Sequence, residues 1–145
     1  MAIYNILYIS KSVNRLGDQD LLQLLETSRD WNVKHGITGM LVYLLPQNSQ
    51  AGRFMQVIEG KREDITSLFH NIKSDRRHHQ ITLLHEGFIN HRNFKDWTMG
   101  FNKTTMDNGF DVPGYIAPET ILATNQQEAK YNIALNYLKS FYSIR

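Results

Sequence analysis

The sequence contains no cysteine among its 145 residues. Disulfide bonds, catalysis by a thiolate and metal sites with cysteine ligands are therefore excluded. No apolar run approaches the roughly 20 residues that cross a bilayer as a helix. The N-terminal Met-Ala-Ile-Tyr-Asn also lacks the basic and apolar regions of a signal peptide. We therefore expect a cytoplasmic protein without direct membrane binding, although a chain without cysteine fits any compartment.

The formal net charge is only +2 at pH 7 and does not by itself indicate a nucleic-acid partner. Basic residues gather between Lys73 and His79, but no aromatic residue stands among them, as a surface that stacks bases requires. We interpret this run as the end of a helix and a solvated turn, and expect no direct nucleic-acid binding. The six histidines lack the spacing of metal ligands, so the sequence indicates no metal site.

Hydrophobic residues make up 41% of the sequence and charged residues 21%, which is ordinary for a globular protein. A chain of 145 residues can form one core but is short for two ordinary domains. Asp18 is expected to cap the first helix, which His35 and Gly36 end. Patterns of apolar residues predict strands over 3–10, 38–45, 53–59, 81–84 and 96–101, and helices over 18–32 and 63–73.

The first six of these elements follow a ferredoxin-like order, strand-helix-strand-strand-helix-strand, with a fifth strand after them. This order predicts an α+β fold with both helices on one face of a mixed sheet. Applying right-handed crossovers, we expect the first and third strands to be central neighbours that run parallel. Tyr8 and Gln56 would then be neighbours on this central pair.

Residues 104–145 differ in composition from the preceding part of the chain. Residues 104–114 are polar and contain glycine and proline, so they are expected to form a linker. Two helices are predicted over 118–124 and 126–142, the second with an apolar stripe. Two helices cannot bury such faces alone, so we expect this extension to pack on the domain formed by residues 1–103 and to end the chain without an effector domain.

Two polar side chains stand among apolar neighbours on the predicted strands. Tyr8 shares a strand face with Ile6, and Gln56 shares one with Phe54 and Ile58. A buried phenol or amide without a hydrogen-bond partner costs about 1–3 kcal/mol. With a tryptophan and a methionine from the fifth strand, this pair could line a site for a flat, polar-edged heterocycle. On spacing alone, an ordinary core tyrosine and a satisfied strand glutamine explain the pattern as well.

Five ordered motifs extend over the first 101 residues. They are Leu7-Tyr8-Ile9-Ser10, Ser28-Arg29-x-x-Asn32 followed by Gly36-Ile37-Thr38-Gly39-Met40-Leu41, Phe54-x-Gln56-x-Ile58-Glu59-Gly60, Asp75-x-Arg77-His78 and Trp97-x-Met99. In this set and order they resemble the BLUF family, blue-light sensors that bind a flavin. The resemblance covers roughly residues 2–101 and implies a flavin-binding domain over residues 1–103.

The resemblance also implies roles for individual residues. Tyr8 matches the photoactive tyrosine of the family, and Gln56 matches the glutamine between that tyrosine and the flavin. Asn32 matches the asparagine that hydrogen-bonds the pyrimidine edge of the isoalloxazine ring. The remaining implied flavin contacts are Ser28 on the same helix stripe as Asn32, Arg77 and His78 near the C2 carbonyl, and Leu24 and Ile72 on the two sides of the ring.

Two tryptophans leave questions open at this stage. Trp97 and Met99 match a signal relay in which the two side chains exchange places beside the flavin, and the sequence does not tell which one faces inward. Trp31 departs from the family pattern, because many relatives have a small polar residue or histidine before the asparagine. It either covers the outer edge of the ring or packs on the surface.

The resemblance implies a light sensor without catalytic turnover that carries FAD, with FMN or riboflavin as alternatives. Blue light would drive an electron and a proton from Tyr8 through Gln56, whose amide rearranges and shifts the flavin absorption to the red. The signal would pass through the fifth strand and the C-terminal helices to a protein partner, within an expected homo-oligomer.

Two other function classes remain open from the residues alone. One is a light-independent ferredoxin-like binding or regulatory module with Tyr8 and Gln56 as ordinary core residues. The other is flavin-dependent oxidoreduction, which is weaker because the sequence has no nicotinamide-binding glycine motif. The fold does not separate these classes, whereas the colour and light response of the purified protein do.

Overall fold

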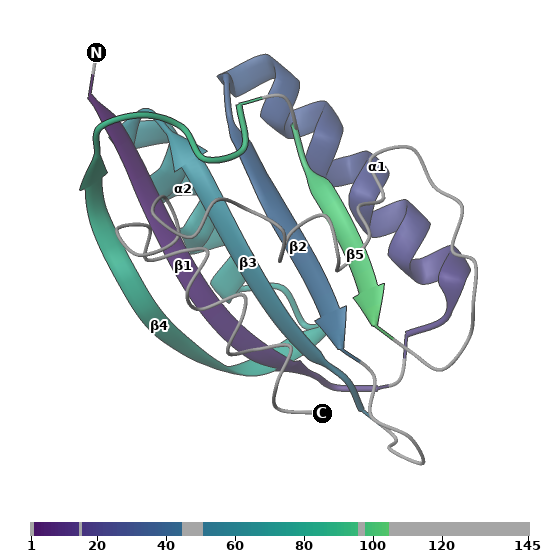
Figure 1. Cartoon of the computed structure of the whole chain (residues 1–145). Helices are drawn as coiled ribbons and strands as arrows, with labels where there is room; N and C mark the ends of the chain where they lie inside the picture. The colour runs from purple at the N-terminus through teal and green to yellow at the C-terminus, as the bar shows by residue number, and fades with distance from the viewer. Residues whose placement is uncertain (1, 15, 45–50, 96–97, 105–145) are drawn as a thin grey trace.

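A computed structural model of the chain describes residues 2–14, 16–44, 51–95 and 98–104, with only the backbone described for residues 100–104. A five-stranded sheet carries two helices on the same face (Figure 1). The elements are β1 (Ile3–Ser12), α1 (Asp18–His35), β2 (Thr38–Leu44), β3 (Arg53–Gly60), α2 (Arg62–Lys73), β4 (His78–Ile89) and β5 (Gly100–Thr104). The predicted α+β, ferredoxin-like fold with an additional strand is confirmed.

The strand order is β4-β1-β3-β2-β5, so β1 and β3 are neighbours as predicted. They run antiparallel, and the expectation of a parallel pair was wrong. The crossover through α1 relates β1 to β2, which run in the same direction. The chain then reverses from β2 into β3, which lies between β1 and β2 and therefore opposes both. The parallel pairing of β2 with β5 makes the sheet mixed.

The two ends of α1 are set by glycines. Asp18 was predicted as the N-cap, but Gly17 has that position and Asp18 is the first helical residue. The side chain of Asp20 accepts a hydrogen bond from the Gly17 N–H at 3.3 Å, which satisfies a backbone donor at the helix start. At the other end Gly36 adopts φ 63° and ψ 35°, a left-handed conformation that glycine reaches without a Cβ penalty. The predicted end of the helix is confirmed.

β4 is much longer than the predicted strand over 81–84. The prediction followed a short apolar run, whereas most residues of β4 are partly or fully exposed and follow no apolar pattern. Its pairing with β1 shifts register between Leu7 and Tyr8 and between Ile9 and Lys11. β4 itself contains backbone with positive φ at Gln80 (53°) and Gly87 (156°).

β5 begins at Gly100, four residues later than the predicted strand over 96–101. Thr98 and Met99 form the bend that leads into it, and residues 96 and 97 lie outside the described part of the chain. The linker was predicted over 104–114, and its first residue is the last residue of β5. The rest of that linker and the predicted helices over 118–124 and 126–142 lie outside the described residues, so their packing stays a prediction.

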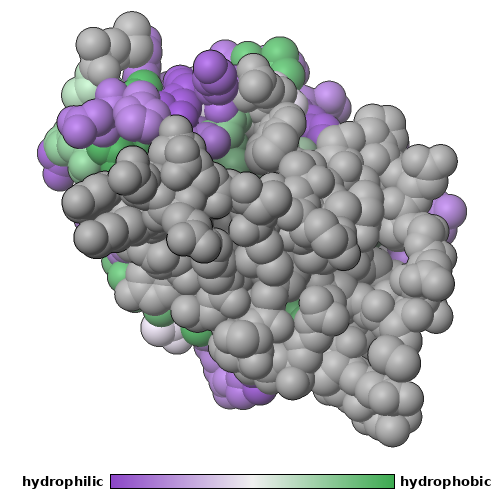
Figure 2. Space-filling model, viewed as in Figure 1, coloured by the Kyte–Doolittle hydropathy of each residue, from purple (hydrophilic) through white to green (hydrophobic). Residues whose placement is uncertain are grey.

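The three central strands of the sheet are buried on both faces, which explains why β1, β2 and β3 are apolar along most of their length. The face toward the helices includes Tyr8, Leu41 and Ile58, packed with Leu21 and Leu25 of α1. The opposite face is made by a second cluster that consists of Leu7, Met40, Val42, Leu44, Met55, Val57 and Phe94. In the view of Figure 2, the described residues that reach the surface are mostly hydrophilic, with smaller hydrophobic areas.

Glu59 at the end of β3 fixes the chain that leads from β4 toward β5. Its fully buried carboxylate accepts hydrogen bonds from the Thr38 hydroxyl at 2.8 Å and from the backbone N–H groups of Asn93 and Phe94 at 2.9 and 2.7 Å. Arg92 joins the same contact by donating to the Thr38 hydroxyl at 2.9 Å and to the Glu59 carbonyl at 3.1 Å. These donors give Glu59 a structural role.

Candidate functional site

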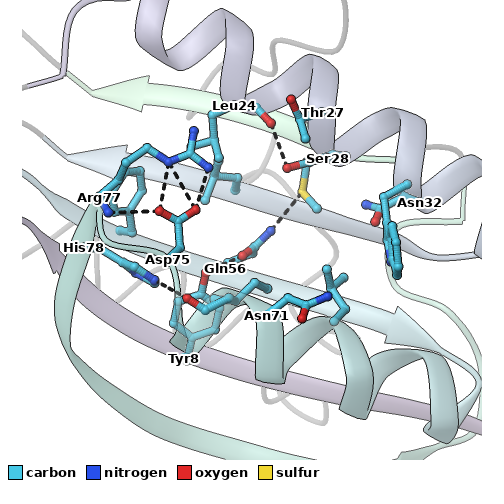
Figure 3. Close-up of a pocket in the computed structure, with 16 residues that line it drawn as sticks. Tyr8, Leu24, Thr27, Ser28, Asn32, Gln56, Asn71, Asp75, Arg77 and His78 are labelled. Atoms are coloured by element: carbon cyan, nitrogen blue, oxygen red, sulfur yellow. Dashed lines mark hydrogen bonds and ion pairs between the residues drawn. The ribbon is translucent and has the colours of Figure 1, made fainter.

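A pocket opens between α1 and α2 above the sheet (Figure 3). Its volume is about 220 Å³, far more than the roughly 10–15 Å³ that a site for one water molecule needs on the same measure. Both helices, four strands and the bend before β5 contribute to it. The lining residues are Tyr8, Leu24, Thr27, Ser28, Trp31, Asn32, Leu41, Phe54, Gln56, Leu68, Asn71, Ile72, Asp75, Arg77, His78 and Met99.

Tyr8 and Gln56 lie at the floor of the pocket, directly opposite each other in the β1–β3 register. Their side chains are only 3% and 6% exposed. The Tyr8 hydroxyl donates a hydrogen bond to Gln56 Oε1, and Gln56 Nε2 donates to Met99 Sδ at 3.6 Å. Both ends of the amide are thus engaged, the stronger contact being made by the phenol and the weaker one by the sulfur.

Burial holds the proton on Tyr8. The ring lies 5.5 Å from the ring of Phe69 and 6.2 Å from that of His78, measured between centroids. Desolvation, and secondarily the negative charge of Asp75, raise the pKa of the Tyr8 phenol well above its ordinary value. The phenol is therefore a neutral hydrogen-bond donor over the whole physiological pH range.

Asn32, which lines the pocket, has a buried hydrogen-bond acceptor without a partner. Its side chain is 1% exposed, and Nδ2 donates to the Thr98 carbonyl at 2.5 Å. Oδ1 is buried and has no hydrogen-bond partner. A buried acceptor without a partner is costly, so this atom fits a ligand that brings an N–H group into the pocket.

Apolar side chains form the walls between which such a ligand would lie. Leu24 projects from α1, Ile72 and Leu68 from α2, and Phe54 from β3. The Ser28 hydroxyl donates to the Leu24 carbonyl at 2.8 Å, which leaves its oxygen free to accept. Two apolar walls with a polar floor and a buried acceptor at one end suit a flat heterocycle whose edge carries N–H and carbonyl groups.

Asp75, Arg77 and His78 make up the polar end of the pocket. Arg77 forms a forked ion pair with Asp75, with Nη2 and Oδ2 2.5 Å apart, and hydrogen bonding from Arg77 lowers the pKa of the Asp75 carboxyl. Both ring nitrogens of His78 are engaged, Nδ1 with the Ser10 hydroxyl at 2.8 Å and Nε2 with the Ile72 carbonyl at 2.6 Å. Because the Ile72 carbonyl can only accept, Nε2 carries a proton in this arrangement.

The structure brings all eight predicted flavin-contact residues into one pocket, Tyr8, Leu24, Ser28, Asn32, Gln56, Ile72, Arg77 and His78. Of the two residues predicted for the signal relay, Met99 lines the pocket with a 2% exposed side chain, while Trp97 lies outside the described residues. For Trp31 the sequence left two placements open, over the outer edge of the ring or on the surface. It lines the pocket, and it is 38% exposed and stacks on His35 with 4.1 Å between ring centroids.

Sequence reasoning assigned no pocket role to Thr27, Leu41, Phe54, Leu68, Asn71 or Asp75. Helical spacing could have indicated two of them, because Thr27 follows Leu24 by three residues and Leu68 precedes Ile72 by four. Asp75 was part of a recognised motif, and its ion pair with Arg77 became evident only from the geometry. Among the described residues no cluster of side chains suited to a metal ion occurs, and none of their helices could span a bilayer.

Known proteins are similar to the part of the chain that forms the pocket. The family described as BLUF, sensors of blue-light using FAD, matches residues 3–100. The beta subunit of photoactivated adenylate cyclase from Euglena gracilis is 34% identical over 96 residues, which cover 65% of this chain and 10% of that protein. The chain therefore spans about a tenth of the length of this curated relative.

Two solved structures resemble the chain over nearly its whole length. BlrB, a BLUF protein in its dark state, is 28% identical with a TM-score of 0.65, and the match covers 96% of this chain and 97% of that one. BlsA in its photo-activated state is 29% identical with a TM-score of 0.64, and the match covers 94% of each chain.

Proposed function

Since the chain belongs to the BLUF family, sensors of blue light that use FAD, we propose that its pocket holds a flavin and that Tyr8 and Gln56 form the light-driven switch. The observation that carries this proposal is the chain of contacts from the Tyr8 hydroxyl to Gln56 Oε1 and from Gln56 Nε2 to Met99 Sδ. An amide has a donor end and an acceptor end, so rotation exchanges what it offers to Tyr8 and to the pocket. Such a two-state element is what a switch requires.

Several residues would hold the flavin. Asn32 Oδ1 would accept a hydrogen bond from an N–H group at the pyrimidine edge, which gives this buried atom its missing partner. Leu24 and Ile72 would cover the two sides of the ring from their helices. Arg77, held in its ion pair with Asp75, and His78, with both ring nitrogens engaged, shape the polar end of the pocket.

When bound, the flavin absorbs blue light and can accept an electron in its excited state. Tyr8 would supply that electron. An oxidised phenol is a strong acid, so its proton would leave along the existing hydrogen bond to Gln56 Oε1, and the amide would pass a proton on to the flavin. After the electron and proton return to Tyr8, the Gln56 amide would be left rearranged, by rotation or tautomerisation. In that arrangement it would give the flavin a stronger hydrogen bond, which moves the absorption to the red.

The raised pKa of Tyr8 supports this assignment. A phenolate would be present in the dark if the pKa were near neutrality, and its hydrogen bond to Gln56 Oε1 would be lost. Burial and the charge of Asp75 instead keep the proton in place.

Illumination of the purified protein tests the proposal directly. We expect a yellow protein whose flavin absorption shifts to the red under blue light and returns in darkness. A colourless protein that stays colourless after incubation with FAD would contradict flavin binding. A yellow protein with an unchanging spectrum would instead favour a light-independent module, with Tyr8 and Gln56 as ordinary core residues.

Asn32→Ala should weaken flavin binding, because the buried acceptor for the ring is lost. The expected cost of one neutral hydrogen bond is about 0.5–1.5 kcal/mol, which corresponds to roughly 2- to 13-fold in the dissociation constant. Titration of flavin-free protein with FAD measures this change. Asn71→Ala is the matched control, since Asn71 lines the same pocket but is exposed to water. Equal affinities of wild type and Asn32→Ala would leave Asn32 with only its contact to Thr98.

We further propose that the light signal leaves the pocket through the backbone that follows Met99, the residue whose sulfur accepts a hydrogen bond from Gln56. Met99 directly precedes β5, so a rearranged amide changes the packing of this strand and of residues 105–145. A protein partner, or a second copy of the chain, would read that change. Hydrogen exchange in dark and illuminated samples should differ for peptides that cover residues 98–104 and the extension. Identical exchange in both states, with and without candidate partners, would place the output elsewhere.

A further inference from the structure

Arg29 belongs to the Ser28-Arg29-x-x-Asn32 motif, yet its side chain neither lines the pocket nor takes part in the proposed photochemistry. It projects from α1 to the backbone that precedes β5. Its Nε and Nη2 atoms both donate to the Met99 carbonyl, at 3.1 and 3.0 Å. Asn32 binds the preceding carbonyl, that of Thr98. Two side chains of one helix therefore hold two successive carbonyls at the start of β5.

Met99 connects this contact to Gln56. Its side chain is almost completely buried, and its sulfur accepts the hydrogen bond from Gln56 Nε2. The same residue therefore gives its backbone oxygen to Arg29 and its sulfur to Gln56. If the amide rearranges, the sulfur loses its donor while the carbonyl remains held to α1.

The guanidinium of Arg29 is well suited to hold a carbonyl. Hydrogen bonds from a charged donor are roughly twice as strong as neutral ones, and a planar fork restricts the direction of approach. Partial burial lowers the pKa of Arg29 from its ordinary value, and the negative charge of Glu26 opposes that change. Since a guanidinium holds its proton far above the physiological pH range, the side chain stays charged at neutral pH.

We propose that Arg29 is a positioning residue that holds Met99 against Gln56 and thereby sets the rate at which the amide returns to its dark arrangement. This inference rests on the proposed function. The return requires Met99 Sδ to be in place for Gln56 Nε2. While Arg29 holds the Met99 carbonyl, the Met99 side chain has few accessible positions. Without Arg29 the bend at Thr98 and Met99 can adopt many more conformations.

Arg29→Leu should bind flavin and show the red shift, but its dark recovery should be slower than wild type by about threefold or more, which is part of the effect of one charge-assisted hydrogen bond. Arg29→Lys keeps the charge but lacks the fork, so its recovery rate should lie between the two. Lys34→Leu is the matched control, because it removes a positive charge from the exposed surface of the same helix. Its recovery should equal that of the wild type. Absorbance after the light is switched off gives all four rates.

The methyl resonance of Met99 provides a readout that needs no flavin. In flavin-free protein with labelled methionine methyl groups, the resonance is identified by its absence in Met99→Leu. Arg29→Leu should shift or broaden it, and Lys34→Leu should leave it unchanged. This measurement also decides the matter if Arg29→Leu binds flavin poorly.

The proposal is overturned if the methyl resonance is unaffected in Arg29→Leu, or if recovery is faster or is slowed by less than about threefold. A wild type that never shows a red shift would reject the proposed function instead. In that case the methyl resonance still decides whether Arg29 positions Met99.

Discussion

Tyr8→Phe is expected to bind flavin as the wild type does and to lose the red-shifted state completely. The substitution removes one hydroxyl and no ring volume, so the pocket keeps its shape. It also removes the electron donor's ionisable proton and the hydrogen bond to Gln56 Oε1. Without a proton to release and recover, the amide has no driving force to rearrange. Difference absorption spectra, recorded before and after blue light, measure the result.

Tyr43→Phe is the matched control for this substitution. Tyr43 is also fully buried in the sheet, where its hydroxyl accepts from the Leu16 N–H at 3.2 Å, but it does not line the pocket. The control should therefore lose some stability while it keeps a full red shift. A normal photoproduct in Tyr8→Phe, or its loss in Tyr43→Phe, would contradict the assigned role of Tyr8.

Gln56→Leu is expected to give a protein that binds flavin with a slightly altered dark spectrum and forms no red-shifted state. Leucine has a similar size but lacks both hydrogen-bonding ends of the amide. The buried Tyr8 hydroxyl would also lose its acceptor, which costs about 1–3 kcal/mol of stability. Absorption spectroscopy measures the first effect and thermal denaturation of flavin-free protein measures the second.

Met99→Leu is the control for Gln56→Leu. It distinguishes loss of the Gln56 amide from loss of the Met99 sulfur that accepts its hydrogen bond. It removes the contact from Gln56 Nε2 to Sδ but leaves Gln56 and Tyr8 intact. We expect this control to keep the red shift. If Gln56→Leu forms the usual photoproduct, Tyr8 acts on the flavin without an amide switch.

The sequence was most informative where a polar side chain stands on an otherwise apolar face of a strand. Tyr8 and Gln56 each interrupt an apolar strand face, and the crossover rule places their strands side by side, so their pairing could be predicted. The rule does not give the direction of that pairing, because a right-handed crossover relates β1 to β2 and not to the strand between them.

The ends of strands and the partners of hydrogen bonds and ion pairs were harder to predict. β4 follows no apolar pattern because most of its residues are partly or fully exposed, so only its apolar centre was recognised. The contact of Arg29 with Met99 joins residues 70 positions apart through a backbone oxygen. Nothing in either side chain encodes such a contact, since any residue offers a carbonyl. The ion pair of Asp75 with Arg77 is local, yet it depends on the turn between α2 and β4.

The irregular pairing of β4 has a consequence for the behaviour of the protein at high concentration. β4 is an outer strand of the described sheet, and Leu83 and Phe88 on it are 43% and 58% exposed. A long, regular and apolar edge would be a template on which strands of other molecules could add. The register shifts against β1 and the positive φ angles at Gln80 and Gly87 break the regular spacing of its N–H and C=O groups. An incoming strand therefore finds only short matching stretches, and the edge resists aggregation despite its apolar side chains.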